Sequence, residues 1–169
     1  RLQKSWGITM RNRGEEAYSH FLEGYNCTQS ILMAYKDFFP EESFSTILSL
    51  SSSFGGGRGR LRDVCGTVSG AFIVLGSIYG YNTPRDNERK TVLYGVIQEF
   101  ASLFEKENGS IVCRNLLGLD GKSSPKPEER TAEYYKKRPC PRICFSSASI
   151  LESFLKEKGI LDENGELKK

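Results

Sequence analysis

The stretch VCGTVSGAFIVLGSIYGY, residues 64–81, decides the fold because it contains no charged side chain. A helix that is apolar on every side belongs in the interior of a bundle or in a membrane. This stretch is short and rich in glycine, serine and threonine, so we expect no membrane span here. We interpret it as a buried central helix. Its small residues Gly66, Gly70 and Ala71 would let a neighbouring backbone or a cofactor come close.

Helical patterns also dominate on both sides of this stretch. Capping residues such as Asn26 and Ser110 precede apolar residues at helical spacing, Pro84 and Asp86 begin another helical pattern, and no run alternates as a strand would. We therefore predict an all-α, single-domain bundle over residues 1–169, with residues 159–169 as a peripheral tail. Seven further helices are predicted, at about residues 10–23, 26–38, 41–51, 84–106, 110–117, 128–136 and 140–158. On the fourth of these, the predicted core stripe is Val92, Leu93, Val96, Ile97, Phe100, Leu103 and Phe104.

Composition and charge exclude several classes of function. The chain has 169 residues, 38% hydrophobic and 27% charged, an ordinary balance for one globular domain. The net charge is only +3, and basic residues are scattered among acidic ones, so we expect no nucleic-acid ligand. Five cysteines cannot all pair within the chain, which favours reduced thiols in the cytoplasm. A signal peptide removed from before Arg1 is left open as an alternative.

Four of the five cysteines fall in the first turn of four predicted helices. Unpaired N–H groups and the helix dipole stabilise a thiolate there, which predicts lowered thiol pKa values. A thiolate binds metals and attacks disulfides, whereas a cysteine that only fills the core has no reason to prefer these positions. If the four converge, they suit an iron–sulfur cluster or a tetrahedral zinc ion. The predicted metal ligands are Cys27, Cys65, Cys113 and Cys140.

The cysteine spacings exclude the short metal motifs. The chain has no CxxC and no CxxCH, so neither a zinc knuckle nor a c-type haem site is present. Cys140 and Cys144 form CxxxC, one helical turn apart, close enough to share a metal or form a strained disulfide. The single histidine, His20, is interpreted as a surface or partly buried helix residue rather than a ligand.

A glycine-rich turn, GGGRGR at residues 55–60, precedes the central helix. Its backbone N–H groups could form a nest for an anion or for the sulfides of a cluster, with nearby arginines adding positive charge. The alternative is a tight turn between helices with exposed arginines. The turn lacks the ending of a Walker loop, and no strand precedes it as a dinucleotide-binding loop requires. The predicted cofactor-binding residues are Gly55, Gly56, Gly57, Arg58, Gly66 and Gly70.

Four motifs occur in the order typical of one family: GYNCTQSIL at 24–32, FGGGRGRLRDVCGTVSGA at 54–71, NGSIVCRNLLG at 108–118 and CPRICFSSASILE at 140–152. The chain resembles the redox-active protein family named for its C_GCAxxG_C_C cysteine pattern. On this resemblance, the family's cysteines correspond to the four predicted metal ligands. Thr67 stands where alanine is expected. Cys144 stands where an aliphatic residue is usual, either as a packing substitute or as a fifth thiol able to exchange with Cys140.

The resemblance implies cluster binding and electron transfer. A related domain lies beside the haem domain of split-Soret cytochromes and is associated with an iron–sulfur site. The haem attachment motif is absent here, so neither haem nor cytochrome activity is expected. The leading hypothesis is a redox protein that holds an iron–sulfur cluster through the four cysteines and exchanges electrons with a partner protein. Zinc is the alternative metal.

Two other hypotheses are left open by the sequence. One is a metal-free thiol–disulfide oxidoreductase, in which Cys140 with Cys144, or Cys27 with Cys65, would form the reactive pair. The other is a non-catalytic helical module that binds another protein and uses its cysteines only structurally. The apolar central helix could pack within one chain or across a homodimer.

Overall fold

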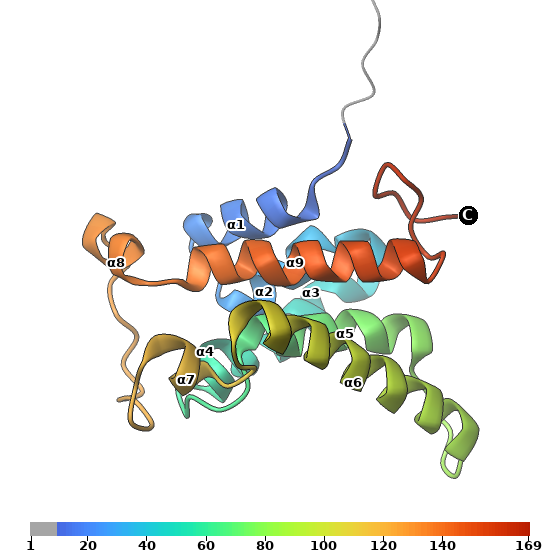
Figure 1. Ribbon diagram of the computed structural model, residues 1–169, viewed down its shortest axis with the longest axis horizontal. Coiled ribbons are helices and arrows are strands. Elements are labelled where there is room, and N and C mark those ends of the chain that lie inside the picture. The colour runs from blue at the N-terminus through green and yellow to red at the C-terminus, as the bar shows by residue number, and fades with distance from the viewer. Residues whose placement is uncertain (1–9) are drawn as a thin grey trace, which may run out of the picture.

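A computed structural model describes residues 10–169 as a bundle of helices (Figure 1). It confirms the predicted all-α class, because the β pairings between residues 10 and 169 are two isolated bridges, Val64 with Val112 and Leu161 with Leu167. No helix in this part of the chain is long and apolar enough to cross a membrane. The helices are α1 (Arg13–Glu23), α2 (Cys27–Ala34), α3 (Glu41–Ser51), α4 (Gly55–Arg58), α5 (Gly66–Tyr79), α6 (Asn87–Asn108), α7 (Cys113–Leu117), α8 (Ala132–Lys137) and α9 (Cys140–Glu157), with short 3-10 turns η1 (Lys36–Phe38) and η2 (Ser52–Phe54).

Side-chain caps begin several helices where the sequence predicts them. The Asn26 side chain accepts the N–H of Gln29, and the Gln29 side chain accepts that of Asn26, so α2 begins with a complete capping box. Asp86 caps α6 with its carboxylate. The prediction that Ser110 caps α7 is wrong. Its hydroxyl accepts the N–H of Val112 in the preceding turn, and Val112 is the N-cap.

Two predicted helix boundaries also differ from the structure. α2 ends at Ala34, and the chain predicted to continue it forms the 3-10 turn η1. α8 begins at Ala132 rather than near residue 128, because the Thr131 side chain caps it by accepting the N–H of Tyr134. The central helix itself is two residues shorter at each end than the apolar stretch.

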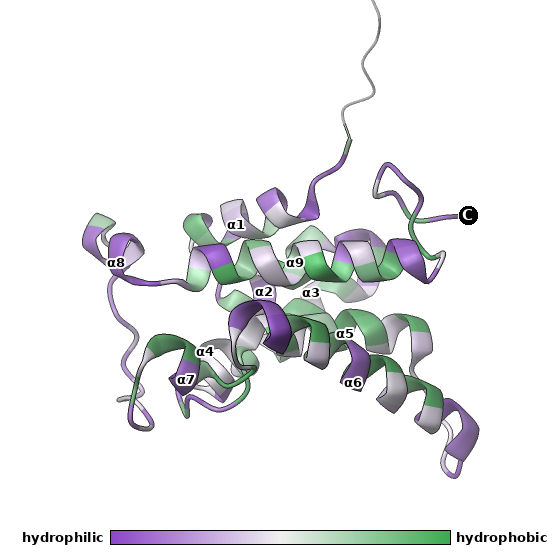
Figure 2. Cartoon of the chain, in the orientation of Figure 1, coloured by the Kyte–Doolittle hydropathy of each residue, from purple (hydrophilic) through white to green (hydrophobic). Residues whose placement is uncertain are grey.

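α5 is the centre of the bundle and contacts α2, α6 and α9, as predicted for the apolar stretch. Gly70 lets α2 come close, because a Cβ atom there would lie 2.8 Å from Ile31 Cβ and 3.0 Å from the Thr28 carbonyl oxygen. α1 and α9 pack along each other in a second layer (Figure 1). Figure 2 shows hydrophobic residues along α5, whereas the beginning of α6 is hydrophilic.

The apolar stripe predicted on α6 is only partly buried. Val96, Phe100 and Phe104 lie in the core, but Val92 and Leu103 are 50% and 40% exposed. Figure 1 shows α6 running away from α9 toward its N-terminal end. The helical period identifies the inward side of a helix but not how far its neighbours extend, so the prediction for Val92 and Leu103 is wrong.

The last residues, predicted as a peripheral tail, are attached to the bundle by a buried arginine. Arg13 is fully buried, and its guanidinium donates to the Asp37 carboxylate at 2.7 and 2.8 Å and to the Gly165 carbonyl oxygen at 2.9 Å. Leu161 is buried as part of the hydrophobic core. The C-terminal segment therefore helps to close the core.

Candidate functional site

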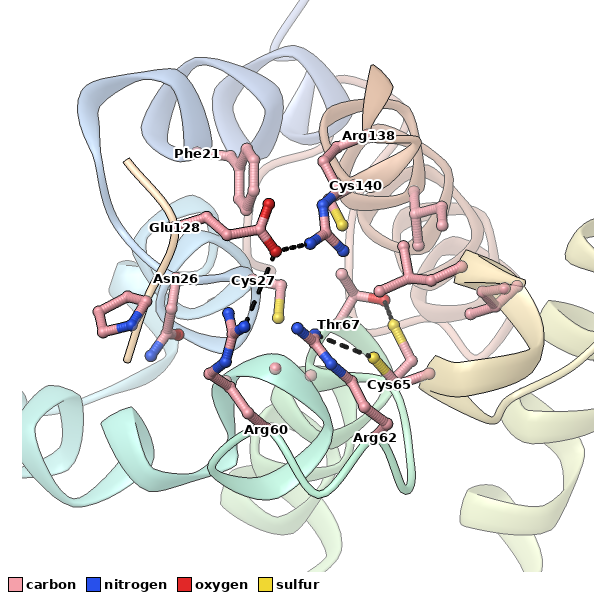
Figure 3. A pocket seen from close by; sticks show the side chains of 18 of the residues that line it. Phe21, Asn26, Cys27, Arg60, Arg62, Cys65, Thr67, Glu128, Arg138 and Cys140 are labelled. Carbon is pink, nitrogen blue, oxygen red and sulfur yellow. Dashed lines mark hydrogen bonds and ion pairs between the residues drawn. The ribbon is translucent and has the colours of Figure 1, made fainter. Parts of the chain in front are cut away.

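Four cysteines line one cavity at the end of the bundle where α2, α5, α7 and α9 begin (Figure 3). The cavity has a volume of about 350 Å³, within the range of small-molecule sites. Long stretches of sequence separate these residues, so the tertiary fold brings them together. They are the four predicted metal ligands, Cys27, Cys65, Cys113 and Cys140.

Each of these cysteines lies at a helix start, as the sequence predicts. Cys27, Cys113 and Cys140 are the first residues of α2, α7 and α9, and Cys65 is the N-cap of α5. The fifth, Cys144, lies one turn further along α9, where it is fully buried in the hydrophobic core and does not line the cavity. All five thiols are free. The structure thus separates a set of four thiols from one core cysteine.

Burial raises the pKa of Cys27, Cys65 and Cys140 and so favours the protonated form of these three thiols. Burial, with a smaller contribution from the neighbouring Cys27, raises the pKa of Cys65 and that of Cys140 to about 12. Burial also raises the pKa of Cys27, although the backbone N–H groups of Gly56 and Thr28 oppose this. The prediction that the helix starts lower the thiol pKa is therefore wrong for these three cysteines, because lost solvation outweighs the N–H groups.

The thiols are not arranged around a single metal ion. Between residues 10 and 169, no group of three or more cysteine, histidine, aspartate or glutamate side chains is placed to hold one. A tetrahedral zinc site needs four donors at about 2.0–2.3 Å from one point. The four thiols instead face a larger common space.

The glycine-rich sequence before α5 forms a left-handed turn. Residues 56–60 all have positive φ values, between 61° and 68°, and Arg62 has a φ of 63°. The Gly59 N–H donates to the Gly55 carbonyl oxygen at 2.9 Å and closes the turn. Left-handed backbone costs a non-glycine residue about 1–2 kcal/mol, so the surrounding structure must hold the arginines of this turn in place.

The turn fits against the cysteines because its glycines lack side chains. A Cβ atom at Gly57 would lie 2.7 Å from Cys113 Cβ. At the start of α5, a Cβ atom at Gly66 would lie 2.3 Å from Cys27 Sγ. Both glycines therefore allow an approach that any other residue would block.

Only some of the predicted cofactor-binding residues line the cavity. Gly55, Gly56 and Gly66 do. Gly57 and Gly70 lie outside the lining and serve close packing instead. Arg58 points out of the site and forms an exposed ion pair with the Asp63 carboxylate at 3.0 Å.

Other charged residues line the cavity beside the cysteines. Glu128 forms ion pairs with Arg138 and, at 3.7 Å, with Arg60 (Figure 3). Arg130 also lines the cavity and donates to two backbone carbonyl oxygens at the end of α1 and the following turn. Four arginines, counting Arg62, and one carboxylate therefore line the cavity.

Arg62 is the most buried of these arginines, at 4% exposure. Its Nε donates to Ser123 Oγ at 2.9 Å, and its Nη1 lies 3.8 Å from Cys113 Sγ. None of the ion pairs formed between residues 10 and 169 includes it.

Sequence reasoning missed Glu128, Arg130 and Arg138. They belong to the chain between α7 and α9, where the sequence predicts only a helix at about residues 128–136. This segment crosses the mouth of the cavity, where Arg60 Nε donates to the Ser124 carbonyl oxygen at 2.5 Å. No spacing in the sequence indicates this contact, because it joins residues far apart in the chain.

The fold and the cavity define an all-α protein whose chemistry lies in buried thiols among arginines. The family profile described as "Putative redox-active protein (C_GCAxxG_C_C)" matches residues 25–154, well over half of the chain, and the chain belongs to this family. The match spans all four cavity cysteines and confirms the resemblance seen in the motifs. No curated protein and no solved structure matches the chain.

Proposed function

We propose that this protein binds an iron–sulfur cluster in the cavity and exchanges electrons with a partner protein. The observation that carries the proposal is the convergence of four thiols, from four separate helix starts, on one cavity. Four cysteine thiolates are the usual ligands of [2Fe–2S] and [4Fe–4S] clusters. When bound, such a cluster supplies one-electron chemistry, and the protein supplies its binding and its electrostatic surroundings. The ligands would be Cys27, Cys65, Cys113 and Cys140.

The four thiols line one cavity without forming a group that could hold a single metal ion within residues 10–169. Cys27 raises the pKa of Cys65 and Cys140, so the sulfur atoms are close enough to interact. Nevertheless, no three donors between residues 10 and 169 surround one point. In a cluster, the thiolates bind different irons of an inorganic core, so they stand further apart than the ligands of one ion. The shared cavity is the support for a cluster, and zinc is kept as the alternative metal.

The charges around the thiols also suit a cluster. Four thiolates with sulfide form a negatively charged group, and buried negative charge needs positive partners. Arg62 Nη1 lies 3.8 Å from Cys113 Sγ, and the Gly56 N–H lowers the pKa of Cys27 against the effect of burial. Hydrogen bonds to the sulfurs and nearby positive charge would raise the reduction potential of the cluster.

The thiol–disulfide alternative has weaker support. The attacking species in disulfide exchange is the thiolate. Burial raises the pKa of Cys65 and Cys140 to about 12 and that of Cys144 well above its ordinary value. Only a small fraction of these thiols is ionised at neutral pH, so they are poor nucleophiles in the metal-free protein.

Absorption spectra with iron and sulfide analysis, on protein purified without oxygen, test the proposal. We expect broad visible absorption that bleaches on reduction, together with stoichiometric iron and sulfide. Replacing any one cavity cysteine by serine should lower the iron content. Cys144→Ala is the matched control and should keep its iron, because Cys144 is buried outside the lining. A colourless, iron-free protein that also fails to take up a cluster on reconstitution would refute the proposal.

A further inference from the structure

The charges that line the cavity do not balance. Four arginines and one carboxylate line it, which leaves a surplus of three positive charges. The net charge of the whole chain is also only +3. The surplus of positive charge in the cavity is therefore as large as the net charge of the entire protein. Walls of low dielectric strengthen the resulting positive potential, which attracts anions.

The surplus of positive charge is unfavourable for stability because one of these arginines, Arg62, is nearly inaccessible to water. It is 4% exposed and forms no ion pair with any residue between 10 and 169. Residues 1–9, RLQKSWGIT, contain no acidic side chain that could neutralise it. A buried guanidinium without a carboxylate is unfavourable. An anion that enters the cavity would remove this penalty.

The backbone of the left-handed turn aims two arginines at the same space. Figure 3 shows Arg60 and Arg62 pointing from the turn toward the centre of the cavity, with Arg138 reaching in from the opposite side. Arg60 and Arg62 have φ values of 68° and 63°, which are unfavourable for arginine. Strain of this kind is characteristic of functional sites.

We propose that the cavity binds a small dianion with carboxylate or phosphate groups, held by Arg60, Arg62 and Arg138. The guanidinium fork binds both groups through two parallel hydrogen bonds. Glu128 pairs with Arg60 and Arg138, so its carboxylate marks where one group of the ligand would bind. The site rests on the arginines rather than on the thiols, so it is tested on metal-free protein, in which no cluster shares the cavity or the charge of Arg62.

Calorimetric titration of metal-free protein, at low ionic strength, tests this site. The probes are inorganic phosphate and succinate, and the tighter binder identifies the preferred group. We expect one anion per chain. Arg60→Gly should weaken binding by about tenfold or more, since it removes a charge-assisted contact. Glu128→Gln should strengthen binding several-fold, because it leaves Arg60 and Arg138 without their internal carboxylate.

Arg58→Gly is the matched control. It removes one arginine from the same turn and relieves the same positive φ, but Arg58 pairs with Asp63 outside the cavity. It should change the affinity by less than about twofold. Binding of neither anion, or equal weakening by Arg58→Gly and Arg60→Gly, would overturn the proposal.

Iron and sulfide measured on the same preparations separate this test from that of the cluster. A protein that takes up no cluster on reconstitution, but whose metal-free form binds the anion with the expected variant effects, leaves the anion site standing and refutes only the cluster. A protein that takes up a cluster, but whose metal-free form binds neither anion, refutes only the anion site.

Discussion

Replacing Gly66 by alanine should destabilise the protein, although alanine is the better helix former. The new Cβ atom would lie 2.3 Å from Cys27 Sγ, 2.7 Å from Thr28 Oγ1 and 3.2 Å from the Phe54 carbonyl oxygen. The contact with the sulfur is about 1 Å shorter than van der Waals contact allows. Cys27 and Thr28 form the capped first turn of α2, and Thr28 is fully buried, so neither can move away freely.

The size of the effect follows from two opposing contributions. Overpacking a tight site costs about 1–3 kcal/mol. Alanine in place of glycine favours a helix interior by at most about 1 kcal/mol, and Gly66 is only the first residue of α5. We therefore expect the free energy of unfolding to fall by about 1–2 kcal/mol. Because the clash displaces Cys27 Sγ, the variant should also retain less iron if the cluster proposal holds.

Urea unfolding of the metal-free protein under reducing conditions measures this change. The matched control is Gly76→Ala in the same helix, where a Cβ atom would meet nothing within 4 Å. That variant should be more stable than the parent by about 0.5–1 kcal/mol. In a Cys27→Ala background, the cost of Gly66→Ala should decrease, because the sulfur is gone. Equal stability of the two alanine variants would refute the reasoning.

Three further predictions follow from buried groups. Thr28 Oγ1 is buried without a hydrogen-bond partner among residues 10–169, so Thr28→Val should raise the free energy of unfolding by about 1 kcal/mol in urea; a loss of stability would show that the hydroxyl has a partner. Arg13→Met should lower the free energy of unfolding by about 1–3 kcal/mol, because it leaves the Gly165 carbonyl oxygen without its donor and leaves the Asp37 carboxylate paired with Arg11 alone, and it should speed hydrogen exchange near Leu161; unchanged exchange there would contradict the attachment described above. The pKa of Cys65 and Cys140, about 12, lies above that of an unfolded thiol, so the folded metal-free chain keeps protons that the unfolded chain releases. The stability that these two thiols contribute should be constant below about pH 8.5 and fall as the pH rises toward 12, and a urea midpoint that increases between pH 8.5 and 12 would rule this out.

Local sequence patterns were sufficient to predict most of the fold and the positions of the cysteines at helix starts. Asn26 and Gln29 form a capping box within four residues, so the start of α2 at Cys27 can be predicted without tertiary information. The uncharged stretch before Tyr81 could only be a buried helix in a chain of this composition. Because the helix starts are determined locally, the cysteines at those starts could be singled out as a set.

Long-range contacts could not be predicted in this way. The Glu128 carboxylate pairs with Arg60 only because the segment after α7 folds against the cavity. No sequence feature near either residue predicts this contact. The raised pKa of Cys65 depends on burial by other parts of the chain, which outweighs the local effect of a helix start. The exposure of Val92 depends on the direction in which α6 leaves the bundle.

The residues that line the cavity come from distant parts of the chain, from Phe21 to Ile143, and this sets the order in which the site can form. α9, which carries Cys140, packs against α1 near the other end of the chain. During synthesis, Cys27, Cys65 and Cys113 emerge from the ribosome before α9 has been made, and contacts between such distant segments form slowly. The pocket is therefore incomplete in every shorter nascent chain, and its ligands can be captured in their final geometry only after synthesis has passed α9. Occupancy of the cavity would thus report that the whole domain has folded.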